Sequence, residues 1–134
     1  MNIITKVKNN IIQNNLIKKG DSVLLAFSGG SDSTAMVHIL SILAKDMGFS
    51  VCAAHINHNI RPEAKFDEEF VKRFCGDLGI ECFVKSADVR TFAKEKSISE
   101  ELAGREIRYE FFDELCKKYS LTSIATAHNK NDSA

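Results

Sequence analysis

The sequence predicts an α/β fold, a doubly wound parallel sheet of the Rossmann-like type with helices on both faces. Short apolar runs alternate with amphipathic stretches of helical length along the 134 residues. The runs at residues 22–27 and 51–54 do not alternate, which is typical of strands buried on both faces of a parallel sheet. A third run at residues 80–85 alternates and is expected at an edge, so the predicted strand order is 3-2-1-4 with right-handed crossovers.

The composition indicates one domain, or a piece of one, without a disordered or low-complexity segment. Lys and Arg together number 18, and Asp and Glu also number 18, so the overall charge does not indicate a nucleic-acid-binding surface. The first 20 residues nevertheless contain four lysines and no acid. These lysines form either an RNA-facing edge or the solvated face of a helix: Lys6, Lys8, Lys18 and Lys19.

The four cysteines lie far apart and include no Cys-x-x-Cys pair. We expect free, mostly buried thiols rather than disulfides or zinc ligands at Cys52, Cys75, Cys82 and Cys116. The N-terminal residues lack the apolar core of a secretory signal, and no apolar run reaches membrane-spanning length. These features predict a cytoplasmic protein without a membrane partner.

Apolar residues three and four positions apart predict the first two helices. The first is expected over residues 3–17, stops near Gly20 and packs across the sheet or its edge. The second is expected over residues 34–47 and ends at Gly48.

A polar loop is expected at residues 55–62, directly after the second strand. The third helix is expected over residues 66–78, because acids in its first turn favour the helix dipole and Gly79 follows its end.

The C-terminal half is expected to contain a short helix at residues 88–96, a long helix and a fourth strand at residues 122–127 beside the first strand. Ser97 and Glu100 have the spacing of a capping box, which predicts the start of the long helix. The apolar residues expected to face inward are Leu102, Tyr109, Phe112, Leu115, Cys116 and Tyr119. On the other side of this helix, Glu101, Arg105 and Arg108 share a face.

A small-residue hexapeptide follows the first strand and precedes the second helix. It consists of Ser28, Gly29, Gly30, Ser31, Asp32 and Ser33. The first N–H groups of a helix have no intrahelical partner and carry partial positive charge, so they can hold a phosphate. Glycines let the backbone approach closely and serines add donors, whereas Asp32 repels a phosphate unless a cation lies between them. The hexapeptide therefore predicts a site for a polyphosphate and Mg²⁺.

Three other loop types do not fit. The chain contains no Gly-Lys pair for a Walker loop and no Gly-x-Gly for a dinucleotide fingerprint, and Ser33 replaces the last glycine of a nucleophile elbow. A serine-rich turn with an N-cap aspartate is the structural alternative for the hexapeptide alone.

The predicted topology brings three loops together at the carboxyl ends of the strands, between strands 1 and 4. They are residues 28–33, 55–61 and 128–132. His55 and His58 have no third ligand at metal spacing, so contacts with adenine or another substrate, or hydrogen bonds within the loop, are expected instead.

The hexapeptide resembles the pyrophosphate-binding loop Ser-Gly-Gly-x-Asp-Ser of the N-type ATP pyrophosphatase (PP-loop) superfamily. Three further segments resemble motifs of the tRNA(Ile)-lysidine synthetase family. Residues 55–61 resemble its His-Val-Asn-His-Gly-Leu-Arg loop, and residues 101–109 resemble its Glu-x-x-Ala-Arg-x-x-Arg-Tyr helix. Residues 127–134 resemble its Ala-His-x-x-x-Asp-x-Ala segment, whereas Asn59 and Gly104 depart from the family's glycine and alanine.

This resemblance implies an ATP-dependent ligase that adenylates the wobble cytidine of an isoleucine tRNA at its C2 oxygen. Free lysine then displaces AMP and forms lysidine. The implied ATP-binding residues are the hexapeptide, Ala54 and His55, and the implied Mg²⁺ ligands are Asp32 and Asp132. The candidate catalytic residues are Asp32, Arg105, Arg108, His128 and Asp132.

The resemblance also implies that residues 1–134 are the N-terminal part of an ATP-binding PP-loop domain, without the C-terminal tRNA-binding region and inactive alone. A homodimer is compatible with it. Two alternatives stay open. One is a PP-loop tRNA thiolase, which would need cysteines at the site, and the other is a non-catalytic ATP-binding module, which has no need of the Arg105 and Arg108 face.

Overall fold

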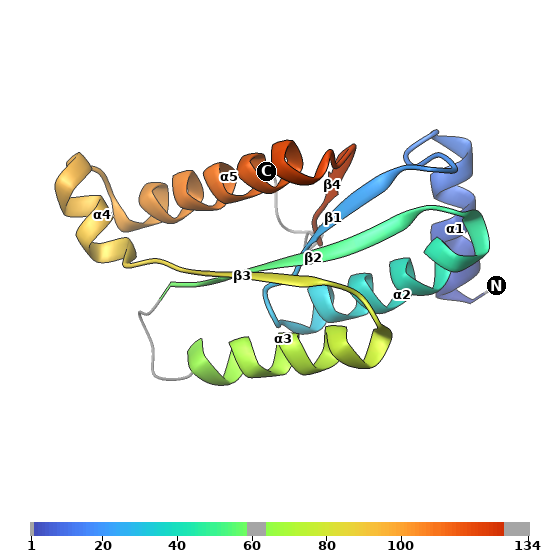
Figure 1. The fold of residues 1–134 in the computed structure, drawn as a ribbon, viewed down its shortest axis with the longest axis horizontal. Helices are drawn as coiled ribbons and strands as arrows, with labels where there is room; N and C mark the ends of the chain where they lie inside the picture. The colour runs from blue at the N-terminus through green and yellow to red at the C-terminus, as the bar shows by residue number, and fades with distance from the viewer. Residues whose placement is uncertain (1, 59–63, 128–134) are drawn as a thin grey trace.

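The computed structural model describes residues 2–58 and 64–127, which form a parallel sheet between two layers of helices (Figure 1). In chain order the elements are α1 (Ile3–Gln13), β1 (Ser22–Ala26), α2 (Ser31–Met47), β2 (Ser50–Asn57), α3 (Ala64–Leu78), β3 (Cys82–Ser86), α4 (Val89–Lys96), α5 (Glu100–Tyr119) and β4 (Ser123–Ala125). Helices α2 and α3 cover one face of the sheet, with α1 beside α2, and α5 covers the other face. Within these ranges, no helix combines the length and apolar character that a membrane span requires.

The sheet confirms the predicted order β3-β2-β1-β4, and its neighbouring strands are parallel. Strand β1 is central, with Leu24 paired to Cys52 of β2 and to Ile124 of β4. Strand β3 lies at an edge, as its alternating pattern predicts. Strand β4 is shorter than predicted, because Thr126 and Ala127 leave the ladder and line a cavity at the carboxyl edge of the sheet.

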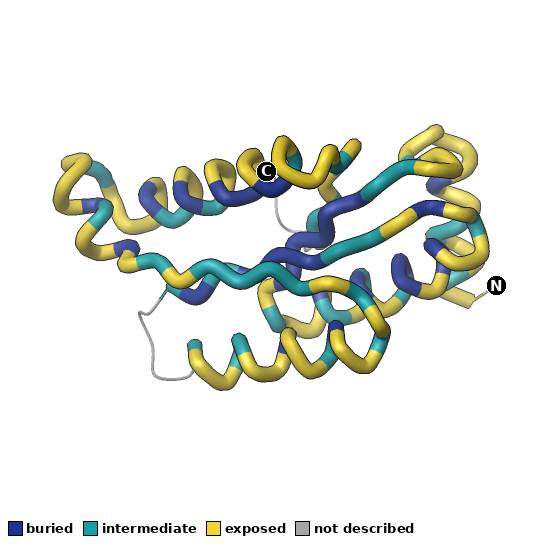
Figure 2. Tube along the Cα trace, viewed as in Figure 1, coloured by how far each residue is buried: buried dark blue, intermediate teal, exposed yellow. Residues whose placement is uncertain are grey.

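Alternate residues of β1 pack into the two helical layers. Val23 and Leu25 belong to a core with α1, α2 and α3, whereas Leu24 and Ala26 pack against α5. Figure 2 accordingly shows buried residues in the middle of the sheet and exposed residues on the outer sides of the helices. Burial on both faces explains why this strand is apolar without alternation.

Helix α1 ends at Gln13 and not at residue 17 as predicted. Asn15 adopts a left-handed φ of 50°, which asparagine tolerates better than most residues, and the chain turns there toward β1. Leu16 is consequently 53% exposed. Lys8 of α1 forms a 2.6 Å salt bridge with Asp46 of α2, so this lysine faces a neighbouring helix.

Helix α2 begins at Ser31, three residues before its predicted start. Gly30 has the extended conformation of an N-cap, with φ −75° and ψ 168°, so the helix starts directly after it. The last three residues of the hexapeptide therefore form the first turn of α2. The predicted end is confirmed, since Gly48 is a left-handed C-cap with φ 78°.

The predicted capping box of Ser97 and Glu100 is wrong. Ser97 has a left-handed φ of 56° and closes α4, so it lacks the extended backbone that an N-cap requires. Ser99 is the N-cap of α5, and its Oγ accepts a 3.1 Å hydrogen bond from Leu102 N.

The buried stripe of α5 differs from the predicted one. Its members recur at intervals of four residues, together with Phe112: Ala103, Ile107, Phe111 and Leu115. Phe112 and Leu115 were predicted to face inward, and this is confirmed. Leu102, Tyr109 and Tyr119 are exposed, so their predicted burial is wrong. Leu102 and Tyr109 instead flank a cavity with the two arginines of α5.

Candidate functional site

The turn between β1 and α2 forms an open cradle of backbone at the carboxyl edge of the sheet. Gly29 has a φ of 99°, a conformation that side chains rarely adopt, and Gly30 provides no side chain to cap α2. The first N–H groups of this helix therefore have neither an intrahelical nor an N-cap side-chain partner. An anion bound here would satisfy them.

Two serine hydroxyls form hydrogen bonds within the cradle. Ser28 Oγ and Ser33 Oγ lie 2.9 Å apart, and Ser33 Oγ donates to Gly30 O at 3.1 Å. Ser33 Oγ also accepts a 3.3 Å hydrogen bond from Gly29 N. Of the first three residues of α2, Ser31 and Asp32 are therefore exposed, whereas Ser33 is buried and hydrogen-bonds within the turn.

Helix α3 packs directly against the cradle. A Cβ atom at Gly29 would lie 3.6 Å from Val71 Cγ1 and 3.7 Å from Asp67 Cβ, both on α3. These are ordinary van der Waals separations, so α3 borders the left-handed turn.

The predicted loop at residues 55–62 begins too early, because β2 continues to Asn57. The first polar residues of the predicted loop therefore belong to β2, and Asn57 pairs with Ser86 of β3. His55 is buried, and its Nδ1 lies 2.9 Å from Phe27 O. Among the described residues its buried Nε2 has no hydrogen-bond partner.

Glu68 of α3 connects this helix to the end of β2. Asn57 Nδ2 donates to Glu68 Oε1 at 3.3 Å, and Lys72 Nζ donates to Glu68 Oε2 at 3.2 Å. These two hydrogen bonds, that of Asn57 first, lower the pKa of Glu68. The sequence analysis missed this network, for which the only signal was the spacing of four between Glu68 and Lys72.

His58 follows β2 and lies against α5. Its Nδ1 is buried without a hydrogen-bond partner in the described part of the chain. Burial lowers the pKa of His58, and the nearby His55 and Arg108 lower it further. Gly104 of α5 is close, since a Cβ atom there would lie 3.9 Å from His58 Cε1.

Two cavities meet beside His58. The first, which we call the loop cavity, has a volume of about 200 Å³ and is lined by Ser28, Ser33 and Ala54 among others. The second, which we call the helix cavity, has a volume of about 780 Å³ and extends along α5. Both are lined by His58, Arg108, Phe112 and Ala127.

The two arginines of α5 line the helix cavity, as their shared face predicts. Arg105 Cζ lies 5.7 Å from the ring centroid of Tyr109, and Arg108 Cζ lies 5.4 Å from that of Phe112. Glu101 lines the same cavity, and among the described residues it forms no ion pair with Arg105. Both guanidinium groups keep their donors for a ligand.

The structure separates the other predicted site residues. Asp32 is exposed on the first turn of α2 and lines an apolar groove between α1 and β4, not the two cavities. An exposed carboxylate beside uncapped N–H groups suits one ligand of a hard cation, but the described residues contain no cluster of three metal-ligating side chains. His128 and Asp132 lie outside the described residues.

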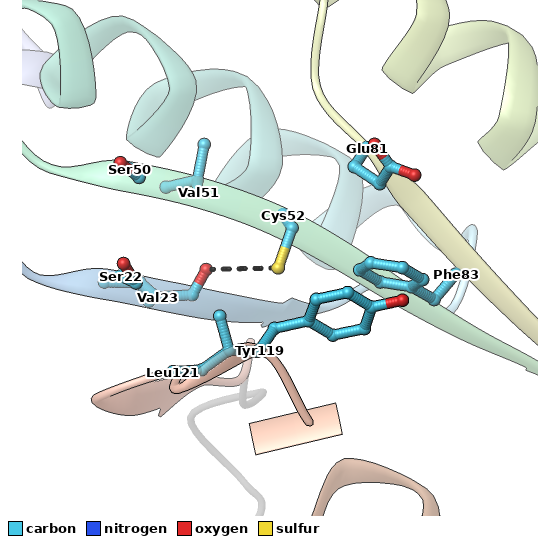
Figure 3. A pocket seen from close by; sticks show the side chains of 9 residues that line it. All are labelled: Ser22, Val23, Ser50, Val51, Cys52, Glu81, Phe83, Tyr119 and Leu121. Carbon is cyan, nitrogen blue, oxygen red and sulfur yellow. Dashed lines mark hydrogen bonds between the residues drawn. The ribbon is translucent and has the colours of Figure 1, made fainter. Parts of the chain in front are cut away.

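A further cavity of about 270 Å³ lies at the opposite, amino edge of the sheet (Figure 3). The rings of Phe83 and Tyr119 stack there with centroids 4.8 Å apart. Cys52 Sγ lies 3.9 Å from Val23 O, and burial is the main cause that raises the pKa of Cys52 to about 11. All four cysteines are free, as predicted, and none lines the loop cavity or the helix cavity.

The sequence is similar to a family of known proteins. The sequence model of the PP-loop domain matches residues 1–134. A tRNA(Ile)-lysidine synthase of Clostridium acetobutylicum is 50% identical over 133 residues, which cover 98% of this chain and 29% of the relative. A tRNA(Ile)-lysidine synthase of Thermosipho africanus is 39% identical over 134 residues, which cover 100% of this chain and 31% of the relative. The chain thus spans about a third or less of the length of these relatives.

Solved structures support the fold. A U34-tRNA thiolase of Methanococcus maripaludis superposes with a TM-score of 0.71 at 18% identity, over 94% of this chain and 45% of the other. An NH3-dependent NAD synthetase of Campylobacter jejuni superposes with a TM-score of 0.66 at 21% identity, over 95% of this chain and 56% of the other. At these identities the likeness concerns the architecture.

Proposed function

The chain belongs to the PP-loop domain family, and from this membership we propose that it serves an ATP-dependent tRNA-modifying ligase. The proposed reaction joins free lysine to C2 of the wobble cytidine of an isoleucine tRNA. ATP first adenylates the base and releases pyrophosphate, and lysine then displaces AMP to give lysidine.

One observation carries this proposal above the alternatives. The match to a tRNA(Ile)-lysidine synthase, at 50% identity, extends over 133 residues, so the aligned region takes in the segments that line the loop cavity and the helix cavity. In support of it, the cradle of β1 and α2 opens into a cavity that also contains a basic helix face. A polyphosphate site next to a chamber with free guanidinium groups suits the transfer of AMP to a nucleic acid.

The cradle would hold the leaving pyrophosphate. The uncapped N–H groups of α2 are proposed as the donors to the charge growing there, and the hydroxyls of Ser28 and Ser33 hydrogen-bond within the turn that presents them. Asp32 would bind Mg²⁺ together with phosphate oxygens, and Asp132 is proposed as a second ligand; the bound ion would neutralise charge on the pyrophosphate. Ala54 and His55, at the end of β2, are proposed to border the nucleotide.

The arginines of α5 would hold the RNA side of the reaction. Arg108 lines both cavities, which supports the proposal that it contacts a phosphate between the two substrates. Arg105 lies one turn earlier in the helix cavity and would contact the base or its phosphate. His128 is proposed to act beside them.

We propose that the 134 residues supply the ATP-binding part of this activity and that most tRNA contacts lie in a region C-terminal to it. Alone, the chain is expected to bind ATP with Mg²⁺ weakly and to form no lysidine. A thiolase is less well supported, because a sulfur-transferring site would need cysteines and none lines either cavity.

The experiment uses the product of the complete open reading frame, an isoleucine tRNA transcript with a wobble cytidine, Mg²⁺ and ATP. Labelled lysine should enter the tRNA only when ATP is present, and a transcript with a wobble uridine should remain unlabelled. Transfer of sulfur in place of lysine would favour the thiolase. ATP binding without any modification of the tRNA would favour a non-catalytic module.

A further inference from the structure

The loop cavity and the helix cavity share four lining residues, and these residues mark a region that both an activated group and a second substrate could reach. The loop cavity reaches Ser28 and Ser33, and the helix cavity reaches Arg105 and the far part of α5. A group activated at the cradle and a nucleophile entering along α5 would therefore approach one another beside His58 and Arg108.

Of the two basic side chains at this junction, only one can take up a proton. Arg108 remains protonated, because a guanidinium group is not deprotonated in proteins. His58 lines both cavities, and its buried Nδ1 has no hydrogen-bond partner in the described part of the chain, so the hydrogen-bonding capacity of this ring is not used up. A side chain whose ring nitrogen is unsatisfied at the meeting point of two cavities is a candidate for proton transfer.

The electrostatic surroundings keep this imidazole neutral. Burial, then His55 on β2, then Arg108 on α5 lower the pKa of His58. Arg105 and Glu101 are the other charged groups of α5 that line the helix cavity, and they oppose one another in sign. A neutral imidazole at pH 7 can accept a proton, whereas an imidazolium cannot.

We propose that His58 accepts the proton that the attacking amine loses during the second half of the proposed reaction. The nitrogen of the amine forms a bond to C2 of the cytidine, and the bond between C2 and the oxygen of AMP breaks with its electron pair leaving on AMP. The surplus proton of the nitrogen passes to the imidazole and then to water. Arg108 faces the phosphate of the departing AMP. This inference rests on the proposed function and assigns a role within it.

The test separates the two half-reactions in the product of the complete open reading frame. His58→Ala should form adenylated tRNA at a rate close to that of the unchanged protein, measured as α-labelled phosphate bound to tRNA in the absence of lysine. Transfer of lysine to that intermediate should slow by about 10²–10⁴-fold, the usual contribution of a general base. Added imidazole should restore part of the lost transfer, because it can occupy the space of the missing side chain.

A matched control is His38→Ala, since His38 is exposed on α2 and lines neither cavity. This variant should keep both rates. The pH profile of transfer should have an acidic limb from ionisation of the attacking amine in both proteins, and this limb should be steeper in the unchanged protein, where His58 must also be neutral, than in His58→Ala. Independently of activity, NMR titration of the 134-residue chain should give the His58 imidazole a pKa below the ordinary value of about 6.5.

The outcomes are distinct. If the unchanged protein forms no adenylated tRNA, the proposed function is wrong and the role of His58 is refuted with it. If it forms lysidine and His58→Ala transfers lysine equally fast, the proposed function stands and the inference is overturned. Equal loss of both half-reactions, or a slow transfer that imidazole does not restore and whose acidic limb is as steep as that of the unchanged protein, would also overturn it.

Discussion

Replacing Gly29 by alanine tests whether the left-handed turn of the cradle is a structural requirement. Gly29 has a φ of 99°, and an alanine held there costs of order 1–3 kcal/mol. The entropy of unfolding, about 2.1 cal/mol/K per residue, amounts to roughly 0.28 kcal/mol/K for a chain of this length. Gly29→Ala should therefore lower the Tm by about 4–11 °C.

The matched control is Gly30→Ala. Gly30 has an ordinary φ of −75°, and a Cβ atom there would lie 3.6 Å from Ser28 Oγ, which is normal contact. Losing a good N-cap residue should cost about 0.5–1 kcal/mol. Circular dichroism melts give both Tm values, and titration calorimetry gives the affinity for ATP with Mg²⁺. Affinity should fall further in Gly29→Ala, because relief of strain moves the donors. A Tm of Gly29→Ala equal to or higher than that of Gly30→Ala would show that the left-handed turn does not require glycine.

Four further predictions concern other parts of the molecule. Asp32→Asn should lose most of the Mg²⁺ dependence of ATP binding and keep its Tm; an unchanged dependence in calorimetric titrations would exclude Asp32 as a metal ligand. Arg108→Lys, in the complete protein, should reduce lysidine formation by about tenfold or more with little change in Tm, because lysine cannot reproduce the guanidinium fork. Gly104→Ala should raise the free energy of unfolding by about 1 kcal/mol, since the helix interior gains an alanine and the nearest atom is 3.9 Å away, and a lowered Tm would contradict this. Because the pKa of Cys52 is about 11, its thiolate is scarce at pH 8 and iodoacetamide should label it more slowly than an unfolded control; labelling should accelerate as the pH rises toward that value.

The sequence predicts the sheet well because burial leaves a local signature. The non-alternating apolar residues at 22–27 reflect packing on two faces, and the alternating residues at 80–85 reflect an edge. From these two patterns and the preference for right-handed crossovers, the strand order follows.

The errors arise where long-range partners decide the structure. His55 and Asn57 have the polar character of a loop, yet they are buried in β2, where His55 Nδ1 lies beside Phe27 O and Asn57 donates to Glu68. Partners from other elements cannot be identified by local spacing. Leu102 and Tyr109 were predicted to face the core, but they line the helix cavity, and their spacing along α5 could not indicate that cavity.

The candidate site was only partly predictable. The hexapeptide has a local physical signature, and topology brings it to the carboxyl end of β2. The junction of His58 with Arg108 depends on how α5 packs over β2, and the signal for Phe112 beside it was only the spacing of four from Arg108. The predicted contributions of His128 and Asp132 stay predictions.

The central claim is that the cradle activates ATP for transfer of AMP to a tRNA base, which lysine then attacks. The most direct measurement mixes the product of the complete open reading frame with isoleucine tRNA, Mg²⁺ and α-labelled ATP, first without and then with lysine. Label should appear on the tRNA in the first stage. Lysine should then release the label as AMP, in an amount equal to the lysine bound. Release of AMP that needs no tRNA, or tRNA that never carries the label while lysine is still incorporated, would contradict it.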